Sequence, residues 1–240
     1  MISKREIKEI RALAQKKFRD ESGLFVVEGE KLVTEALQSG HEVVKLFRTE
    51  EIGEEEMARI SLLTHPSPAL AVVRKPAETA FVPPTGELML ALDSLRDPGN
   101  VGTILRIADW FGIRTVLASP DTVEIYNPKV VQATMGAIFR VRVHICPLPE
   151  TLAGLRRAGM PVYGTFLQGN PLYGAPLAQT GVIVLGSERD GISPAVEAVV
   201  SERLYIPPFP PGEAPGPESL NVATAAAIVC GEFRRRLIVR

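Results

Sequence analysis

The stretch LMLALDSLRDPGNVGTILRIADWFG, residues 88–112, carries the pattern on which the fold prediction depends. It opens with a nearly unbroken apolar run, which is typical of a strand buried on both faces of a parallel sheet. A Gly-Asn-Val-Gly segment then leads into a helical pattern with an apolar side made of Val101, Ile104, Leu105, Ala108 and Phe111. Because glycines before a helix expose backbone N–H groups, the sequence predicts a strand, a turn and a helix, in which the turn either binds an anion or is a plain tight turn.

One turn beyond the glycines, Arg106 lies on the side of this predicted helix opposite the apolar residues. On spacing alone it is either a solvated cation paired with Asp109 or a planar cation that binds a phosphate beside the turn. The stretch is not GxGxxG, yet Asp121 after the next predicted strand leaves a dinucleotide site open. No Gly-Lys-Ser or Gly-Lys-Thr follows, which excludes a P-loop.

The alternation of strand and helix continues to the end of the chain. Strands are predicted near 88–95, 114–119, 140–146, 161–167, 181–188 and 203–207, with helices after most of them and a last helix at about 220–236. This pattern indicates an α/β fold with a mostly parallel sheet and helices on both faces. Ligands of such sheets bind beyond the carboxyl ends of the strands. We therefore expect the loops at 96–101, 166–171, 186–192 and 207–220 to meet at one edge.

The N-terminal third has a pattern of its own. Residues 3–18 predict one helix with an apolar stripe made of Ile7, Ile10, Leu13, Ala14 and Phe18. Strands at 23–29, 42–48 and 69–75 alternate with helices at 30–38 and 54–63, which indicates a small α/β domain over 1–75. The segment 76–86, with three prolines and a glycine, is the predicted linker to a second domain over 87–240.

Composition indicates a globular protein, since 45% of the residues are hydrophobic, 23% are charged and the net charge is −1. Residues 1–19 hold seven Lys or Arg against two Glu, which weakly indicates a phosphate partner or else a solvated helix face. Cys146 and Cys230 show neither CxxC nor Cys/His spacing, so we expect no disulfide scaffold and no metal. Without a signal peptide or a run of about 20 apolar residues, we expect a cytoplasmic protein with no membrane segment.

Two further motifs follow predicted strands. In VIVLGSERDGIS, residues 182–193, Glu188 comes directly after an apolar strand, in what is otherwise an ordinary glycine-containing loop. In ESLNVATAAAIVCGEFRRR, residues 218–236, Ser219 and Asn221 stand near a helix start, and the small residues behind them permit close packing. An alanine-rich core helix explains the body of this second motif, but not the order Ser-Leu-Asn-Val at its start.

Taken in this order, the three motifs resemble the SpoU (TrmH-type) RNA ribose 2′-O-methyltransferases of the SPOUT superfamily. DPGNVGTILRIADWFG matches the first signature, VLGSERDGIS the second, and IPP followed by ESLNVATAAAI the third. KKFRDESGLFVVEGEKLVTEAL resembles the N-terminal substrate-binding domain of the rRNA-directed members. The resemblance implies a deep trefoil knot in the C-terminal domain, S-adenosyl-L-methionine as cofactor, RNA (rRNA above all) as substrate, and a homodimer formed through the C-terminal domain.

The resemblance also assigns site residues by position. The implied catalytic residues are Arg106, Asn100, Glu188, Ser219 and Asn221. The implied cofactor-binding residues are Thr165, Phe166, Leu167, Gly169, Gly186, Glu188, Gly191, Ile206, Leu220, Asn221 and Ala225. Because an arginine has a pKa above about 12, we predict that Arg106 binds an RNA phosphate and stabilises the emerging alkoxide. The proline-rich stretch 207–217 is longer than the usual family loop. It is interpreted either as a preformed lid or as an ordinary insertion.

Three other functions remain to be separated from this one. The same fold could methylate tRNA, although the N-terminal domain favours rRNA. It could also be a catalytically silent RNA-binding or ribosome-assembly factor, against which the intact Asn100, Arg106 and Glu188 argue. A nicotinamide enzyme would bind NAD in place of S-adenosylmethionine.

Overall fold

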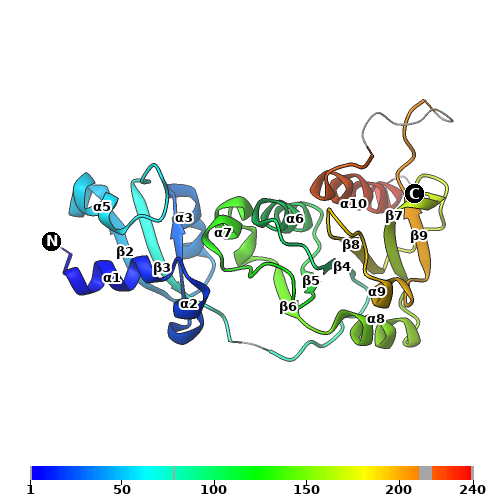
Figure 1. Ribbon diagram of the computed structural model, residues 1–240, viewed down its shortest axis with the longest axis horizontal. Helices are drawn as coiled ribbons and strands as arrows, with labels where there is room; N and C mark the ends of the chain where they lie inside the picture. The colour runs from blue at the N-terminus through cyan, green and yellow to red at the C-terminus, as the bar shows by residue number, and fades with distance from the viewer. Residues whose placement is uncertain (1, 78, 211–217, 239–240) are drawn as a thin grey trace. The chain divides into compact units, whose positions relative to one another are not determined.

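The computed structural model describes residues 2–77, 79–210 and 218–238. The chain folds into two compact units (Figure 1). The first comprises 1–80 together with 124–140, and the second comprises 81–123 and 141–240. The segment 124–140 thus belongs to the first unit, although in the sequence it lies between two neighbouring strands of the second unit's sheet.

The first unit is built on an antiparallel sheet with strand order β1-β3-β2. Its strands are β1 (Leu24–Glu28), β2 (Val43–Arg48) and β3 (Ala69–Arg74). Its helices are α1 (Lys4–Ala12), α2 (Lys16–Ser22), α3 (Glu30–Gln38), α4 (Thr49–Ile52), α5 (Glu54–Ile60), α7 (Pro128–Thr134) and the 3-10 turn η1 (Ala137–Phe139). Alternation along β1 sends Phe25 and Val27 into a core with α3 and α7, and sends Val26 into a second core with α1 and α5.

The single helix predicted over 3–18 is wrong, because the chain breaks between α1 and α2. The guanidinium of Arg19 is buried, with 2% of the residue exposed, and its Nη1 donates to the carbonyl of Leu13 at 2.7 Å. The Leu13 carbonyl thus accepts a side-chain hydrogen bond at the point where the helix is interrupted. Phe18, predicted to face the core, is instead 37% exposed. The apolar pattern did not predict that Arg19, directly after Phe18, would be buried in its place.

The second unit contains a six-stranded, all-parallel sheet with order β6-β5-β4-β8-β7-β9, which confirms the predicted α/β fold. Its strands are β4 (Leu88–Asp93), β5 (Thr115–Ala118), β6 (Arg142–Ile145), β7 (Val162–Pro171), β8 (Gly181–Gly186) and β9 (Glu202–Tyr205). Its helices are α6 (Pro98–Trp110), α8 (Leu148–Arg157), α9 (Pro194–Glu197) and α10 (Val222–Ile238).

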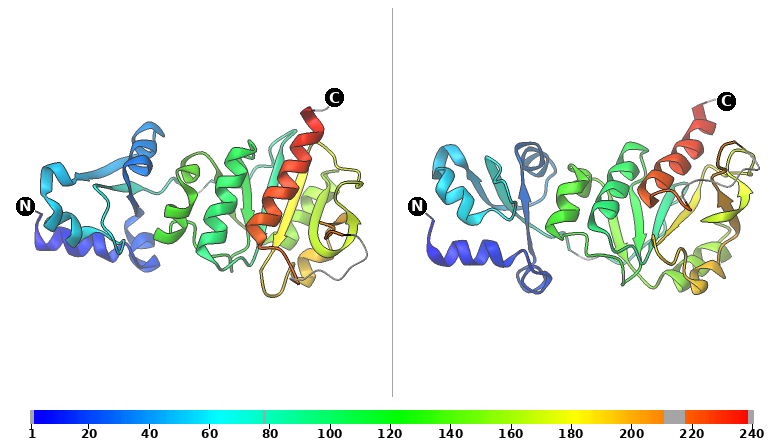
Figure 2. Two further views of the ribbon diagram at one scale, coloured as in Figure 1. Left: turned by 90° about the horizontal axis from the view of Figure 1, so that it is seen from above. Right: turned by 45° about the horizontal axis from the view of Figure 1, so that its top comes forward.

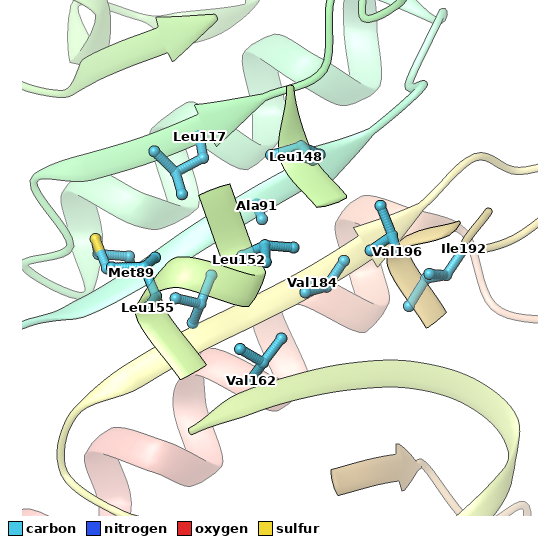
Figure 3. Packing of buried hydrophobic residues seen from close by; sticks show 11 residues of the cluster. Met89, Ala91, Leu117, Leu148, Leu152, Leu155, Val162, Val184, Ile192 and Val196 are labelled. Carbon is cyan, nitrogen blue, oxygen red and sulfur yellow. The ribbon is translucent and has the colours of Figure 1, made fainter. Parts of the chain in front are cut away.

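Helices cover both faces of this sheet. Helices α6 and α10 lie side by side on one face, and α8 and α9 lie on the other (Figures 1 and 2). Figure 3 shows the core under α8, where Leu152 and Leu155 pack against Met89 and Val162 of the strands. In the part of the chain that the structure describes, no helix has the length and apolarity to cross a membrane.

Candidate functional site

Helix α6 starts earlier than the sequence suggested, at Pro98. The side chain of Asp97 caps it by accepting the N–H of Asn100 at 2.7 Å, and proline suits the first helical position because its missing N–H would be unpaired there. The glycines of the motif therefore lie inside the helix, and Gly102 is buried. The predicted anion-binding turn at 99–102 is wrong, since an Asp carboxylate already occupies that end of the helix.

Three side chains from the three sequence motifs form one hydrogen-bonded chain. Asn221 donates from Nδ2 to Oδ1 of Asn100 at 2.9 Å, and Asn100 donates from Nδ2 to Oε1 of Glu188 at 2.5 Å. These residues come from the start of α10, the first turn of α6 and the loop after β8. Their meeting confirms that the loops after β4 and β8 and the start of α10 converge at the carboxyl edge of the sheet.

The direction of this chain is set by its first member. The Oδ1 of Asn221 accepts the backbone N–H groups of Ala223 at 2.9 Å and Thr224 at 3.2 Å, which caps the start of α10. Its amide nitrogen must then face Asn100, and the amide nitrogen of Asn100 must face Glu188. Glu188 is therefore held as an acceptor through one oxygen, and its second oxygen accepts no hydrogen bond from the described residues.

The turn that carries Glu188 depends on two glycines. Ser187 and Gly191 exchange backbone hydrogen bonds of 3.0 Å in both directions, and Gly191 has a φ of +69°. A Cβ on Gly186 would lie 2.2 Å from the carbonyl carbon of Gly191, so only glycine allows the turn to fold back. The two predicted cofactor-binding glycines thus have a structural role in shaping the Glu188 turn.

Asp93 supports the same turn and was missed by the sequence analysis. It is 3% exposed at the end of β4, and its Oδ2 accepts the N–H of Ser193 at 2.7 Å. The register between β4 and β8 places Asp93 opposite Gly186, which lets one carboxylate fix the far end of the neighbouring loop. The only signal in the sequence was an acidic residue closing an apolar strand.

Arg106 is not part of this hydrogen-bonded chain. It lies six residues beyond Asn100 on α6, which corresponds to about 9 Å of helical rise and a turn of about 120°. Its side chain is exposed and has no hydrogen bond or ion pair with any residue that the structure describes. The alternative pairing with Asp109 is wrong, because Asp109 binds Nη1 of Arg114 at 2.9 Å.

The remaining predicted site residues lie at the ends of β7 and β9 and the start of α10. Thr165 donates from Oγ1 to the carbonyl of Val184 at 3.0 Å and is half-buried, while Leu167 and Gly169 are exposed beyond it. Ile206 and Ala225 are half-buried; Ser219 and Leu220 are exposed. Of the proline-rich stretch 207–217, residues 211–217 lie outside the described part of the chain.

This arrangement offers fixed amides, a partly engaged carboxylate and an exposed guanidinium. No group of three or more His, Cys, Asp or Glu side chains able to hold a metal ion occurs among the described residues. Burial raises the pKa of the Cys230 thiol to about 12, and burial also raises the pKa of Cys146. Both thiols are therefore poor nucleophiles, and the polar chemistry of this unit lies with the amides, Glu188 and arginine.

Comparison with known proteins places the chain within one family. Residues 87–231 match the SpoU rRNA Methylase family, and residues 4–77 match the MRM3-like substrate binding domain. The 23S rRNA (guanosine(2553)-2'-O)-methyltransferase RlmP of Bacillus subtilis (strain 168) is 31% identical, over 95% of this chain and 96% of its own.

Two solved structures show the same fold over nearly the whole chain. A TrmH-family protein from Porphyromonas gingivalis is 43% identical with a TM-score of 0.89, covering 98% of this chain and 99% of its own. The AdoMet-bound rRNA methyltransferase from Sinorhizobium meliloti is 29% identical with a TM-score of 0.86, covering 99% and 97%. With its three motifs in register and a match over more than half its length, this chain belongs to the SpoU rRNA Methylase family.

Proposed function

We propose that this protein transfers the methyl group of S-adenosylmethionine to a ribose 2′-hydroxyl of rRNA. The observation that carries the proposal is the hydrogen-bonded chain from Asn221 through Asn100 to Glu188, which joins all three motifs at the carboxyl edge of a parallel sheet. Relatives named as rRNA 2′-O-methyltransferases and an AdoMet-bound neighbour of the same fold support both the reaction and the cofactor.

The carboxyl edge of the sheet suits S-adenosylmethionine chemically. Residues 166–169 have no register partner in β9, and residues 188 and 189 lie at the exposed tip of their turn, so their backbone groups can meet an adenosine. Leu167 and Leu220 present exposed apolar side chains for a flat base. The bound cofactor supplies an electrophilic methyl group on a sulfonium. The proposed pocket residues are Thr165, Phe166, Leu167, Gly169, Gly186, Glu188, Gly191, Ile206, Leu220, Asn221 and Ala225, within the trefoil knot that the family resemblance implies.

The chain's own residues divide the work of orientation and charge stabilisation. Asn221 and Asn100 fix Glu188 at the edge where the ribose enters, and the exposed Ser219 precedes Asn221 by two residues. Arg106 binds an RNA phosphate and directs its guanidinium at the reacting ribose oxygen. There it stabilises the negative charge that develops on the hydroxyl oxygen, whose proton passes to the phosphate that Arg106 holds.

The first unit favours rRNA over tRNA as the substrate. Residues 4–77 match the MRM3-like substrate binding domain, and the rRNA methyltransferase RlmP matches over 95% of this chain. A solved structure concerned with tRNA 2-OH methylation covers only 64% of it. Because RNA sites of this kind are read by shape and unstacked bases, the target nucleotide has to be found by experiment.

The test is methyl transfer to RNA from cells that lack the protein. Purified protein with labelled S-adenosylmethionine should label rRNA, and ribose-methylation mapping should find one new 2′-O-methyl site. Calorimetry should show binding of S-adenosylhomocysteine and none of NAD. Label in tRNA alone, or no binding of S-adenosylhomocysteine, would contradict the proposal.

We also infer that the protein acts as a homodimer through the face formed by α6 and α10. Trp110, at the end of α6, is 85% exposed and lies one turn beyond Arg106 on the same side of the helix. Exposed tryptophan is unusual on a monomer and is typical of interface centres. Replacing Trp110 with Glu should convert a dimer into a monomer in sedimentation experiments, whereas a wild-type monomer would contradict the inference.

Mixing two inactive variants tests whether two protomers share one site. If Arg106 of one protomer acts with Glu188 of the other, heterodimers of Arg106→Ala and Glu188→Gln contain one intact site. Random exchange should then restore about a quarter of the wild-type activity. If the two residues act within one protomer, the mixture should stay inactive.

A further inference from the structure

Strand β7 carries a bulge next to the proposed cofactor pocket. Thr165 and Asn170 both pair with Leu204 of β9, so residues 166–169 are pushed out of the parallel ladder. None of these four residues has a register partner in β9. Leu167 is 70% exposed, whereas the half-buried Phe166 ring packs against the core on the α8 and α9 side of the sheet. The strand ladder therefore does not fix residues 166–169, and the contacts of the Phe166 side chain become important for their conformation.

Arg203 of β9 contacts the bulge at its first residue. The Cζ atom of Arg203 lies 3.7 Å from the centroid of the Phe166 ring, a close cation–π stack. The same guanidinium forms an ion pair with Glu197 at the end of α9. Arg203 therefore links a cofactor-loop residue to a helix that packs on the rigid core.

Gly164 and Gly169 allow close packing around the Phe166 ring and Arg203, because neither glycine has a Cβ atom. A Cβ on Gly164 would lie 2.5 Å from Cε2 of Phe166, so the ring rests on bare backbone. A Cβ on Gly169 would lie 2.5 Å from the carbonyl oxygen of Arg203, so the second end rests on the backbone of that residue. Asn170 adds a hydrogen bond of 3.1 Å to Glu202.

Resting on the proposed function, we propose that Arg203 is a positioning residue that holds the 166–169 bulge in the form that accepts S-adenosylmethionine. It clamps the Phe166 ring between its guanidinium and Gly164, which leaves the backbone of 166–169 to face the cofactor. Arg203 touches no reacting atom in this arrangement. Its effect is on the fraction of molecules whose loop is ready to bind, and a lower fraction weakens the apparent affinity in proportion.

The experiment measures S-adenosylhomocysteine binding and methyl-transfer kinetics for Arg203→Met. We expect the dissociation constant and the KM for S-adenosylmethionine to rise about three- to tenfold, the range of a partly exposed cation–π contact. The kcat at saturating cofactor and the affinity for RNA should stay within about twofold of wild type. Arg157→Met, at an exposed arginine without a described partner in the same unit, is the matched control and should change nothing.

Two further variants separate positioning from folding. Arg203→Lys keeps the charge but not the planar stack and should restore part of the affinity. Phe166→Leu should weaken binding as Arg203→Met does. Because both changes remove the same contact, the dissociation constant of the double variant should not exceed the larger of the two single-variant values. If Arg203→Met does not fold, Glu197→Gln, which removes only the ion pair, should give a smaller rise in the dissociation constant.

The outcomes distinguish this inference from the function on which it rests. Failure of the unaltered protein to bind S-adenosylhomocysteine would overturn the proposed function. Normal binding by the wild type together with unchanged binding in Arg203→Met and Phe166→Leu would overturn only the role of Arg203. A lower melting temperature without any change in cofactor affinity would also overturn it, because it would show a structural role alone.

Discussion

Arg19 in the first unit and Arg106 in the second are both helical arginines, and their surroundings are opposite. Arg19 is 2% exposed; its Nε donates to Glu124 at 3.0 Å, its Nη2 also binds Glu124, and its Nη1 donates to a backbone carbonyl. Arg106 is exposed and has no partner among the described residues. One guanidinium has its donors used within the fold, and the other has all of them available to a ligand.

The two arginines therefore differ in role: Arg19 contributes to stability, and Arg106 is available for function. Burying a guanidinium is costly unless its hydrogen bonds are made, so Arg19 can persist only with Glu124 and the Leu13 carbonyl in place. It therefore joins the segment 124–140 to the first unit. An exposed arginine needs no partner within the fold. Because Arg106 belongs to the first sequence motif on α6, we interpret it as a ligand-binding residue.

The largest expected effect is on catalysis at Arg106. Arg106→Lys keeps the positive charge but loses the planar fork that can bind a phosphate and a ribose oxygen together. We expect kcat/KM to fall by about 100- to 1,000-fold, with an unchanged melting temperature. Methyl-transfer rates and thermal unfolding measure the two effects, and Arg157→Lys is the control. Near wild-type turnover would contradict the role of the fork.

Arg19→Met should produce the reverse pattern. Among the described residues it leaves Glu124 with Lys75 as its one ion-pair partner, at 3.4 Å from Nζ, so we expect about 3 kcal/mol loss in the free energy of unfolding. The kcat of the folded fraction at saturating RNA should be unchanged. Adding Glu124→Gln should recover part of the loss, because it removes the poorly compensated charge. Unaltered denaturant unfolding would show that this buried pair is not a major source of stability.

The same contrast explains what could be predicted from the sequence. The family resemblance assigned Asn100, Glu188 and Asn221 to the site. The residue pattern alone predicted only that loops after parallel strands meet at one edge of the sheet. The start of α6 and the break before α2 were not found. The first depended on how strongly Asp97 caps with Pro98 behind it, which the glycines obscured.

The break before α2 depended on a partner far along the chain. Arg19 is buried because Glu124, which is 105 residues away, supplies its counter-charge, and no local pattern announces that pair. Asp93 was missed for a similar reason, since its hydrogen bond joins the end of β4 to Ser193, 100 residues along the chain. The meeting of loops at one sheet edge was predictable from the alternation of strands and helices. Neither the cap at the start of α6 nor single polar contacts between distant segments were predictable.

A smaller effect is expected where one exposed and one half-buried arginine bind the same carboxylate. Glu232 of α10, with a side chain 5% exposed, accepts hydrogen bonds from Arg235 at 2.7 Å and from Arg236 at 2.8 Å. The hydrogen bond from Arg235 is the main reason that the pKa of Glu232 falls to about 2. Arg236 also donates to the carbonyls of Leu172, Tyr173 and Ala175, so the pair helps hold the segment after β7.

Because the folded-state pKa of Glu232 is lowered, its contribution is complete above the ordinary glutamate pKa and is lost as pH falls toward 2. Glu232→Gln should lower the free energy of unfolding at pH 7 by about 1–2 kcal/mol. The gap from wild type should narrow as pH falls from about 5 to 2. Urea unfolding across that range measures it, with Glu150→Gln, an exposed carboxylate without a described partner, as the control. If the difference in unfolding free energy stays constant with pH, the arginines contribute through packing and carbonyl contacts. Arg236 would then have a purely structural role, as Arg19 does.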